Sequence, residues 1–455
     1  MPTNALALSR KRILLAAAVV AVLAASVLWW CGGAHADADT TAAAPVSPQK
    51  VIKRNFADPE VNHFGKTYYA YATNTGGRNL PVATAPSPGG PWKVHGKDAL
   101  PRLGAWAKGG KTWAPDVSRR ADGKYLLYYT AHSRHPDLQC IGAAVAKSPL
   151  GPFKPLGTKA LVCPPSDGGA IDASSFVEGK QRYLLYKSDL NSRGLRPKLY
   201  LQRTDASGVR FQRSRVTLLR NDLKSEHGII EAPVMVKHGD WYVLFYSGGV
   251  FSKDNYFTGV ARSRTLTGPF KRMRPLITTA STDGAVKGPG GADVVPGAHG
   301  VDSVFFHGLT GAGRSMFRAD LGWAGGRPVV RGSRARYEAE NGAFHDCRVR
   351  DHAKGASGGK VAARIDHSDS HVDIRFFAPR AGRYFVAVGY ATGSRQGATH
   401  RLSVDGGAAR TVTYPLTGWD NWKRVHLTVN AKAGWNTLRF AHGKGFTELD
   451  FVEVR

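Results

Sequence analysis

Three acidic residues stand in sequence surroundings that favour acid–base chemistry. Asp58 lies in the segment NFADPEV, Asp172 in GGAIDASSF and Glu231 in GIIEAPV. Apolar and small neighbours would remove each carboxyl from water, which raises a carboxyl pKa, and a second carboxylate nearby separates the pKa values further. Hydrolysis of a glycosidic bond needs one carboxylic acid to protonate the leaving oxygen and one carboxylate to activate water or attack. Each residue alone is more typical of a turn or a strand cap, so the prediction depends on their occurring together.

A repeated aromatic phrase predicts the elements that position these residues. It recurs in residues 65–71, 123–129, 181–186, 239–246 and 300–306, about 60 residues apart. Each copy is a short run rich in Tyr, Trp and other apolar residues that follows a turn, which is typical of a strand. A repeat of this kind predicts an all-β fold with a five-bladed propeller. Asp58, Asp172 and Glu231 precede the first, third and fourth copies, so we expect them at equivalent positions, at one end of the propeller axis.

The chain of 455 residues is long enough for two domains. We place the propeller at residues 51–331, after a linker at 37–50 that is rich in Ala, Thr, Pro and Ser. From residue 336 to 455 the aromatic phrase is absent, and short strands alternate with turns that contain Gly and Asn. This pattern predicts a β-sandwich, jelly-roll-like domain.

The first 36 residues have the features of an export signal. A basic RKR triplet precedes an apolar run over residues 13–30, and Ala34 and Ala36 match the small residues of a cleavage site. We therefore expect a secreted protein without stable membrane association after cleavage; the alternative is an uncleaved anchor. Cys31 follows two Trp residues, which argues against a lipoprotein.

The formal net charge of +29 restricts the partners. Basic charges are scattered between the predicted strands rather than gathered in a block, and an exported protein rarely meets nucleic acid, so we expect no nucleic-acid partner. Adhesion to an acidic, uronate-bearing polysaccharide fits better. An ordinary solvated surface rich in Arg is the alternative. We expect a monomer.

The cysteines that would remain after cleavage at residue 36 are compatible with a disulfide. Cys140 and Cys163 both fall in the second repeat unit, on segments expected to be neighbouring strands, and we predict that they pair in an exported protein. Cys347 is then unpaired and expected to be buried.

Several short motifs together resemble glycoside hydrolase family 43. They are ADPEV at 57–61, WAPDV at 113–117, IDASSF at 171–176, EAP at 231–233 and GRSM at 313–316. The resemblance implies a five-bladed, inverting, secreted polysaccharide hydrolase. It implies that Asp58 is the general base, Glu231 the general acid and Asp172 the residue that orients the acid and modulates its pKa. By the same match, Trp113 and Arg314 are substrate-binding candidates.

One motif departs from that family. A GPGH phrase usually opens the fifth blade, and its histidine helps to hold a water or metal ion on the axis. This chain has GPGGAD at 288–293, with Gly291 at the expected histidine. Asp293, His299 or His307 could reach inward instead, so an axial calcium ion or water stays an open question.

The C-terminal region resembles carbohydrate-binding modules of families 6 and 35. The matching segments are YEAEN at 337–341, ASGGKV at 356–361, WDNW at 419–422 and LDFVEV at 449–454. The resemblance implies a structural calcium ion held by Glu338, Glu340 and Asp450, whose hard oxygen ligands suit calcium. Candidates for stacking on sugar rings are Trp419, Tyr390 and Trp422, of which Trp422 matches a position that is usually buried.

The resemblance to glycoside hydrolase family 43 implies a glycosidase that acts on α-L-arabinofuranosyl linkages of arabinan or arabinoxylan. A β-xylosidase or exo-β-galactanase of the same family is the alternative within the enzyme class. The alternative from another class is a non-catalytic carbohydrate-binding or adhesion protein, which would be expected to have lost one of the three carboxylates. Exo and endo action are not distinguished.

Overall fold

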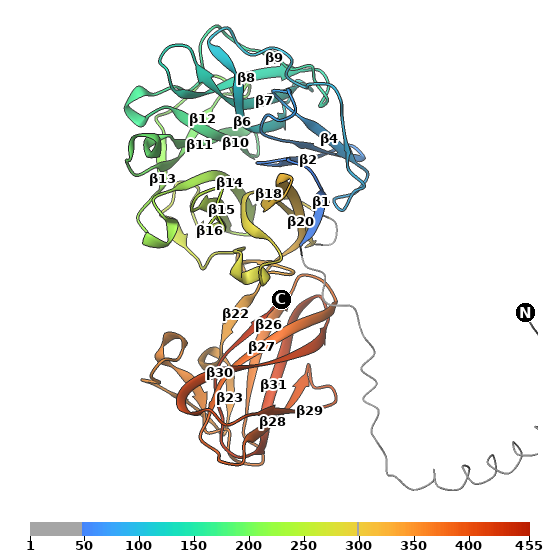
Figure 1. Ribbon diagram of the computed structural model, residues 1–455, viewed down its shortest axis with the longest axis vertical. Helices are drawn as coiled ribbons and strands as arrows, with labels where there is room; N and C mark the ends of the chain where they lie inside the picture. The colour runs from blue at the N-terminus through green and yellow to red at the C-terminus, as the bar shows by residue number, and fades with distance from the viewer. Residues whose placement is uncertain (1–47, 298–299) are drawn as a thin grey trace, which may run out of the picture. The chain divides into compact units, whose positions relative to one another are not determined.

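The computed structural model describes residues 48–297 and 300–455, and this part of the chain is all-β (Figure 1). The predicted export signal and most of the linker lie outside the described residues. Helical structure in the described part includes short 3-10 turns: η1 (Pro165–Asp167), η2 (Leu190–Arg193), η3 (Lys224–Glu226), η4 (Ala280–Thr282), η6 (Ala339–Asn341) and η7 (Ser357–Gly359). None of the described helices is long and apolar enough to span a membrane.

Five antiparallel sheets follow one another along the described residues up to Val330. Sheet 1 contains β2 (Glu60–Phe64), β3 (Thr67–Tyr71), β4 (Val82–Ala85) and β5 (Lys93–Val94). Sheet 2 contains β6 (Ala107–Arg119), β7 (Tyr125–Ser133), β8 (Gln139–Ala146) and β9 (Lys154–Pro155). Sheet 3 contains β10 (Ala170–Glu178), β11 (Gln181–Ser188), β12 (Lys198–Thr204) and β13 (Val216–Arg220).

Sheets 4 and 5 complete this series. Sheet 4 contains β14 (Ile230–His238), β15 (Trp241–Gly248), β16 (Phe257–Ser263) and β17 (Lys271–Arg272). Sheet 5 contains β18 (Lys287–Val295), β19 (Asp302–Thr310), β20 (Gly313–Trp323) and β21 (Pro328–Val330), together with the N-terminal strand β1 (Gln49–Ile52), which pairs with β20. The predicted aromatic phrases form the second strand of each sheet, β3, β7, β11, β15 and β19, which confirms them as strands.

The first strands of the five sheets contact one another in a cycle. Strand β2 contacts β6, which contacts β10; β10 contacts β14, β14 contacts β18, and β18 returns to β2. Apolar aromatic side chains of the second strands, such as Tyr71, Tyr128 and Phe245, are fully buried. This arrangement brings the starts of the five first strands together, although they are far apart in the sequence.

An irregular backbone residue is repeated just before or within each first strand. A residue with positive φ occurs there in each of the five sheets: Asp58, Ala114, Asp172, Ala232 and Gly291. In the last four of these sheets the strand register shifts at this residue, as in a β-bulge. Left-handed backbone costs energy for residues other than Gly, and such strain concentrates at functional sites.

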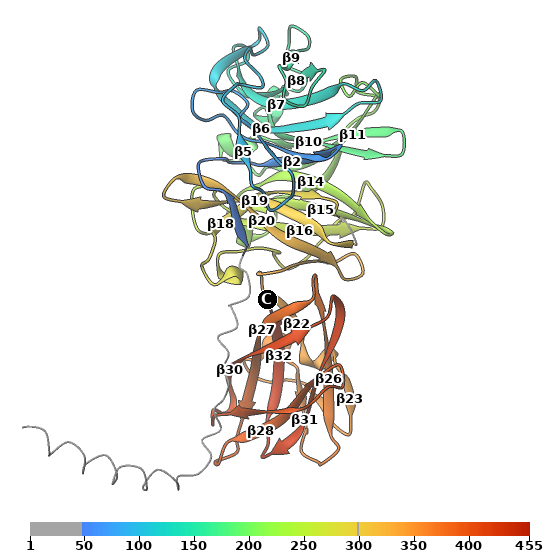
Figure 2. The same ribbon diagram turned by 90° about the vertical axis from the view of Figure 1, so that its right-hand side faces the viewer.

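Two further sheets follow Val330. One contains β22 (Ala335–Glu338), β24 (Arg348–Arg350), β25 (Val361–Ala363), β27 (Gly382–Thr392), β30 (Gly418–Ala431) and β32 (Glu448–Val454). The other contains β23 (Ala343–His345), β26 (His371–Ala378), β28 (Ala398–Val404), β29 (Arg410–Tyr414) and β31 (Gly434–Lys444) (Figure 2). Phe376 and Leu438 of the second sheet share one hydrophobic core with Tyr384 and Val452 of the first.

The cysteines follow the sequence prediction in one respect and depart from it in another. Cys140 and Cys163 form a disulfide, as predicted. Cys347 is a free thiol, but it is only half-buried, whereas the sequence led us to expect a buried one. The short strands around it, β23 and β24, leave it near the surface, where its Sγ lies 3.0 Å from the carbonyl oxygen of His371.

Candidate active site

Asp58 is held by three side chains from other parts of the chain. Its Oδ1 accepts a hydrogen bond from Nη1 of Arg314 at 2.9 Å, and its Oδ2 accepts one from Oγ1 of Thr73 at 2.5 Å. Nδ1 of His307 lies 3.3 Å from Oδ1 and accepts the backbone N–H of Asp58 at 3.1 Å. Burial alone would raise the pKa of Asp58, but Arg314, His307 and Thr73 outweigh it and hold that pKa well below its ordinary value. These contacts therefore favour the ionised carboxylate of Asp58.

His307 occupies the space left by the glycine at position 291. The two residues lie on neighbouring strands, since Gly290 pairs with His307 across β18 and β19. A Cβ atom on Gly291 would lie 2.8 Å from Nδ1 of His307, so no larger side chain fits while the ring is there. His307 is fully buried, burial lowers its pKa, and its Nε2 has no hydrogen-bond partner in the described part of the chain. His307 is thus the residue that reaches inward among those considered from the sequence.

Of the other two candidates for that position, only Asp293 lies among the described residues. Asp293 accepts the backbone N–H of Val61 at 2.7 Å, and burial raises its pKa to about 7. His299 lies outside the described residues.

Glu231 accepts hydrogen bonds on both carboxylate oxygens. Nζ of Lys187 donates to Oε2 at 3.1 Å, and the hydroxyl of Tyr256 donates to Oε1 at 2.9 Å. Lys187 is only 1% exposed and also lies 3.7 Å from Oδ1 of Asp189. Burial alone would lower the pKa of Lys187. The charges of Glu231 and the other nearby carboxylates raise this pKa by more than burial lowers it, so the net shift is upward. A buried ammonium ion is therefore fixed against Glu231.

Asp172 is next to Glu231 in space. Its Oδ2 accepts the backbone N–H of Ala232 at 2.9 Å. Burial, followed by the charge of Glu231, raises the pKa of Asp172 to about 7, although Lys187 acts in the opposite direction. The two carboxyls repel each other, and the nearby ammonium of Lys187 offsets part of this repulsion.

A continuous set of contacts joins the three carboxylates. Tyr256 bonds to Glu231 and stacks on the ring of His307, with ring centroids 5.5 Å apart and planes 10° apart. His307 in turn touches Asp58. The structure thus brings together the three acidic residues singled out from the sequence.

Their positions are not equivalent, which corrects the expectation from the repeat. Asp58 and Asp172 are themselves the positive-φ residues of their sheets, whereas in sheet 4 that residue is Ala232. Glu231 lies one position earlier, directly before the bulge. The bulge lets side chains from two consecutive positions reach the same site.

Lys187, Tyr256 and Thr73 are site residues that the sequence reasoning missed. Lys187 carries a sequence signal, because it is a charged residue that ends the otherwise apolar run YLLY of the third aromatic phrase. Tyr256 and Thr73 have none, because aromatic and Thr residues are common throughout these strands.

The three predicted sugar-contacting residues have different surroundings. Arg314 is in the site, bound to Asp58. Trp113 is half-buried on β6, directly before Ala114, whose N–H donates to Thr73 at 3.0 Å. Trp419 is 51% exposed on β30, in the C-terminal region. A fourth candidate, Tyr390, is buried and donates to the carbonyl oxygen of Pro415, so its proposed stacking on sugar was wrong.

Trp422 is half-buried rather than fully enclosed, and its indole N–H donates to the carbonyl oxygen of Lys354 at 2.9 Å. Its place beside a small cluster of buried alanine and valine side chains agrees with a structural residue.

The predicted calcium ligands Glu338, Glu340 and Asp450 influence one another electrostatically. Burial, and then the charges of Glu338 and Glu340, raise the pKa of Asp450 to about 6. Oε2 of Glu340 is buried without a hydrogen-bond partner. However, Arg274 forms an ion pair with Glu338, and no group of three or more His, Cys, Asp or Glu residues in the described ranges is close enough to hold a metal ion.

Comparison with known proteins establishes the family. The model of the glycosyl hydrolases family 43 matches residues 47–328. The chain belongs to this family. It is 30% identical over 263 residues to "Probable arabinan endo-1,5-alpha-L-arabinosidase A" of Aspergillus flavus, covering 53% of this chain and 77% of that protein. This family 43 member is therefore a glycosidase that hydrolyses O-glycosyl bonds.

Two further matches extend the comparison. The "Extracellular endo-alpha-(1->5)-L-arabinanase 2" of Bacillus subtilis is 25% identical over 236 residues, covering 47% of this chain and 49% of that protein. A solved structure described as a thermostable family-43 glycoside hydrolase is 24% identical, with a TM-score of 0.57, and covers 63% of this chain and 96% of that one. The solved structure supports the fold of the catalytic region.

Proposed function

We propose that this glycosidase hydrolyses α-L-arabinofuranosyl linkages in arabinan or arabinoxylan with inversion of configuration. The observation that carries the proposal is the grouping of Asp58, Asp172 and Glu231 in one site. Asp58 is held ionised there, while Asp172 and Glu231 lie close enough to repel each other. The names of the relatives from Aspergillus flavus and Bacillus subtilis support arabinan as the substrate class.

Asp58 is the general base in this proposal. Arg314, His307 and Thr73 hold it ionised and fix its orientation, so that it can take a proton from the attacking water. Inversion requires room for that water between the base and the sugar, opposite the general acid.

Glu231 is the general acid, and its donors explain how it can give up a proton. When Glu231 protonates the leaving oxygen it becomes a carboxylate, and Lys187 and Tyr256 are already placed to stabilise that charge. Asp172 and Glu231 repel each other when both are charged, and this repulsion, together with burial, raises the pKa of Asp172 and keeps one proton on the pair up to about pH 7.

We expect Asp172→Asn to move the alkaline limb of the pH–rate profile to lower pH, by about one unit or more, and to lower kcat. The native pair should lose its proton, and therefore its activity, as pH rises through about 7. Without the Asp172 carboxyl there is no carboxyl pair to hold that proton, so the limb should move to lower pH. Profiles of kcat/KM for Asp172→Asn and for the exposed control Asp240→Asn test this, and an unshifted limb in Asp172→Asn rules out the modulating role.

We also propose that the five sheets form a five-bladed propeller and that the two C-terminal sheets form a carbohydrate-binding β-sandwich of a secreted, monomeric protein. The cycle of contacts between first strands and the shared C-terminal core support these assignments. The printed name of the extracellular relative from Bacillus subtilis supports secretion.

Calcium is proposed as a structural ion of the C-terminal region, held by Glu338, Glu340 and Asp450 after these side chains move closer together than they lie in the described residues. Mutual repulsion of these carboxylates favours a cation there, and Arg274 would have to release Glu338. We expect calcium at 100 times its Kd to stabilise the protein by about 2.7 kcal/mol, measured as a rise in Tm over protein in EDTA. Glu340→Gln should remove the rise, whereas a rise that survives this change places the ion elsewhere.

The substrate assignment is tested with aryl α-L-arabinofuranoside, β-xyloside and β-galactoside together with linear arabinan. Activity confined to the arabinofuranosyl substrates supports the proposal, and a preference for xyloside or galactoside replaces it with the β-xylosidase or exo-β-galactanase alternative. No activity on any of them, with polysaccharide binding intact, favours the non-catalytic binding protein.

A further inference from the structure

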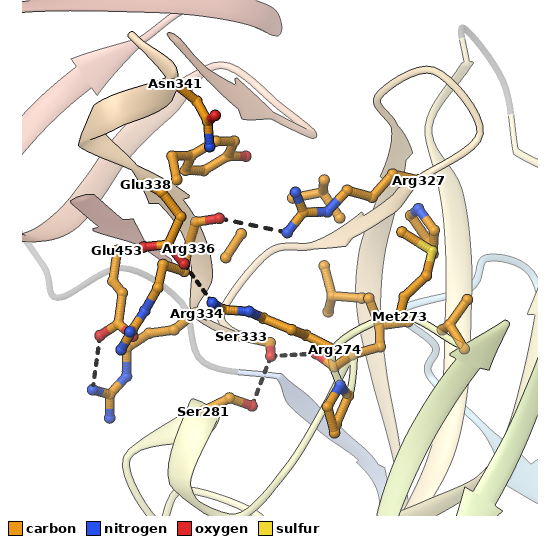
Figure 3. Close-up of a pocket in the computed structure, with 18 of the residues that line it drawn as sticks. Met273, Arg274, Ser281, Arg327, Ser333, Arg334, Arg336, Glu338, Asn341 and Glu453 are labelled. Carbon is orange, nitrogen blue, oxygen red and sulfur yellow. Dashed lines mark hydrogen bonds and ion pairs between the residues drawn. The ribbon is translucent and has the colours of Figure 1, made fainter. Parts of the chain in front are cut away.

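A basic pocket lies apart from the catalytic carboxylates and has no part in the proposed mechanism. It has a volume of about 1250 Å³, and Asp58, Asp172 and Glu231 do not line it. Its walls come from the later strands β16, β17 and β21 on one side and from β22, β26, β30, β31 and β32 on the other (Figure 3). Ligand pockets commonly measure about 300–1,000 Å³, so this one has room for several sugar rings.

The charges on the pocket wall are strongly unbalanced. Among the described residues, nine arginine and lysine side chains line the pocket, against three carboxylates, those of Glu338, Asp373 and Glu453. Glu453 is shared by three guanidinium groups, those of Arg336 at 2.6 Å, Arg424 at 3.2 Å and Arg334 at 3.6 Å. The carboxylate of Glu338 forms an ion pair with Arg274, as Figure 3 shows. The wall carries a surplus of positive charge that its own acids do not neutralise.

Three arginines of the pocket lack a carboxylate partner in the described part of the chain: Arg262, Arg327 and Arg375. Arg262 and Arg327 donate only to backbone carbonyl oxygens, at 3.2 and 3.5 Å. Burial, and then the charge of Arg327, lower the pKa of Arg262, which shows that like charges crowd one another here. An anion bound in the pocket would relieve the repulsion between Arg262 and Arg327. Their guanidinium groups can form bidentate hydrogen bonds with a carboxylate.

An exposed aromatic ring lines the same pocket. Trp435 on β31 is 41% exposed, and the guanidinium of Arg375 lies 4.8 Å from its ring centroid. The guanidinium lies over one face of the ring, so a sugar would stack on the part of the ring that stays exposed. A ligand with both carboxylates and apolar ring faces would fit this combination better than a simple inorganic anion.

We propose that this pocket binds a uronate-bearing oligosaccharide, with carboxylates on Arg262, Arg327 and Arg375 and a sugar face on Trp435. The pocket holds the acidic part of a mixed polymer on the enzyme while the carboxylate site hydrolyses a neutral linkage. Such tethering raises the local concentration of substrate. The proposal does not depend on which linkage is hydrolysed.

The test uses the full chain and calorimetric titration with a hexamer of galacturonic acid. The methyl-esterified hexamer, which has the same backbone without charge, is the ligand control. Arg327→Ala/Arg375→Ala is the pocket variant, and Arg210→Ala/Arg213→Ala, which removes two exposed charges between β12 and β13, is its matched control. Trp435→Ala removes the ring and keeps the charges. Tm and activity on an aryl glycoside, expected to stay at the native level, verify folding.

We expect the native protein to bind the acidic hexamer. The affinity of the pocket variant for this hexamer should be lower by about tenfold or more, and that of Trp435→Ala should be lower by several-fold. The affinity of the matched control should stay within twofold of the native value. Binding should weaken with added salt, because exposed charges are screened. Equal binding of the methyl ester, equal losses in the two double variants, or no binding overturns the proposal. A DNA oligonucleotide of equal charge that binds as tightly and is lost in the same variant replaces uronate recognition with unselective polyanion binding.

Discussion

Asp58→Asn should lower kcat by about 10²–10⁴-fold on arabinan and on activated aryl arabinofuranosides alike. Water must be activated whichever leaving group departs, so a good leaving group cannot compensate for the missing base. Asn is close to Asp in size, its amide oxygen can still accept from Arg314, and its amide N–H can donate to the hydroxyl of Thr73, so the fold should persist. Steady-state kinetics on both substrates measure the effect.

The control for this variant is Asp240→Asn, which removes a carboxylate that is exposed at the surface and paired with Arg264. It should keep native activity. If Asp58→Asn keeps more than a tenth of native activity on either substrate while its Tm is unchanged, Asp58 is not the base, and its ion pair with Arg314 is only structural.

Glu231→Gln should show a loss that depends on the leaving group. On arabinan, where the departing sugar oxygen must be protonated, we expect a fall of about 10²–10⁴-fold. On an aryl arabinofuranoside with a nitrophenolate leaving group, which departs without a proton, we expect less than about a tenfold fall in the same step. Comparing kcat/KM on the two substrates measures this difference.

Lys187→Met is a useful companion to that variant. It removes the cation beside Glu231 while keeping a long apolar chain in a buried position, so it should also impair arabinan more than the aryl substrate. A Glu231→Gln enzyme that loses the same factor on both substrates would contradict the assignment of Glu231 as the acid.

The sequence predicted the strands and the meeting of the three carboxylates because both depend on local, repeated patterns. Each aromatic phrase combines a turn with a short apolar run, and the structure has a second strand at every copy. Asp58, Asp172 and Glu231 each precede such a copy, which was enough to expect them at one end of the predicted propeller axis.

The offset of Glu231 could not be predicted, because the spacing between a carboxylate and its aromatic phrase does not reveal which residue takes the left-handed conformation. Ala232 takes it in sheet 4, whereas Asp58 and Asp172 take it in theirs. From the sequence, His307 was one of three residues that could reach inward in place of the histidine of the family. It could not be singled out, because its contact with Asp58 depends on the pairing of β18 with β19 and on the absence of a side chain at Gly291.

The basic pocket was also beyond prediction from sequence. Its charges come from segments between Arg262 and Glu453, and along the chain they look like the scattered Arg residues of a solvated surface. Only the folded arrangement shows that three guanidinium groups share Glu453 and that Arg375 lies over Trp435.

The central claim is that Asp58 directs water to one face of the sugar while Glu231 protonates the bond on the other. Proton NMR of arabinan hydrolysis, recorded before the product anomers equilibrate, tests it directly. Inversion of an α-L-arabinofuranosyl linkage predicts that the β-anomer of the product appears first. If the α-anomer appears first, the linkage is cleaved with retention, and Asp58 and Glu231 do not act as the base and acid of a single displacement.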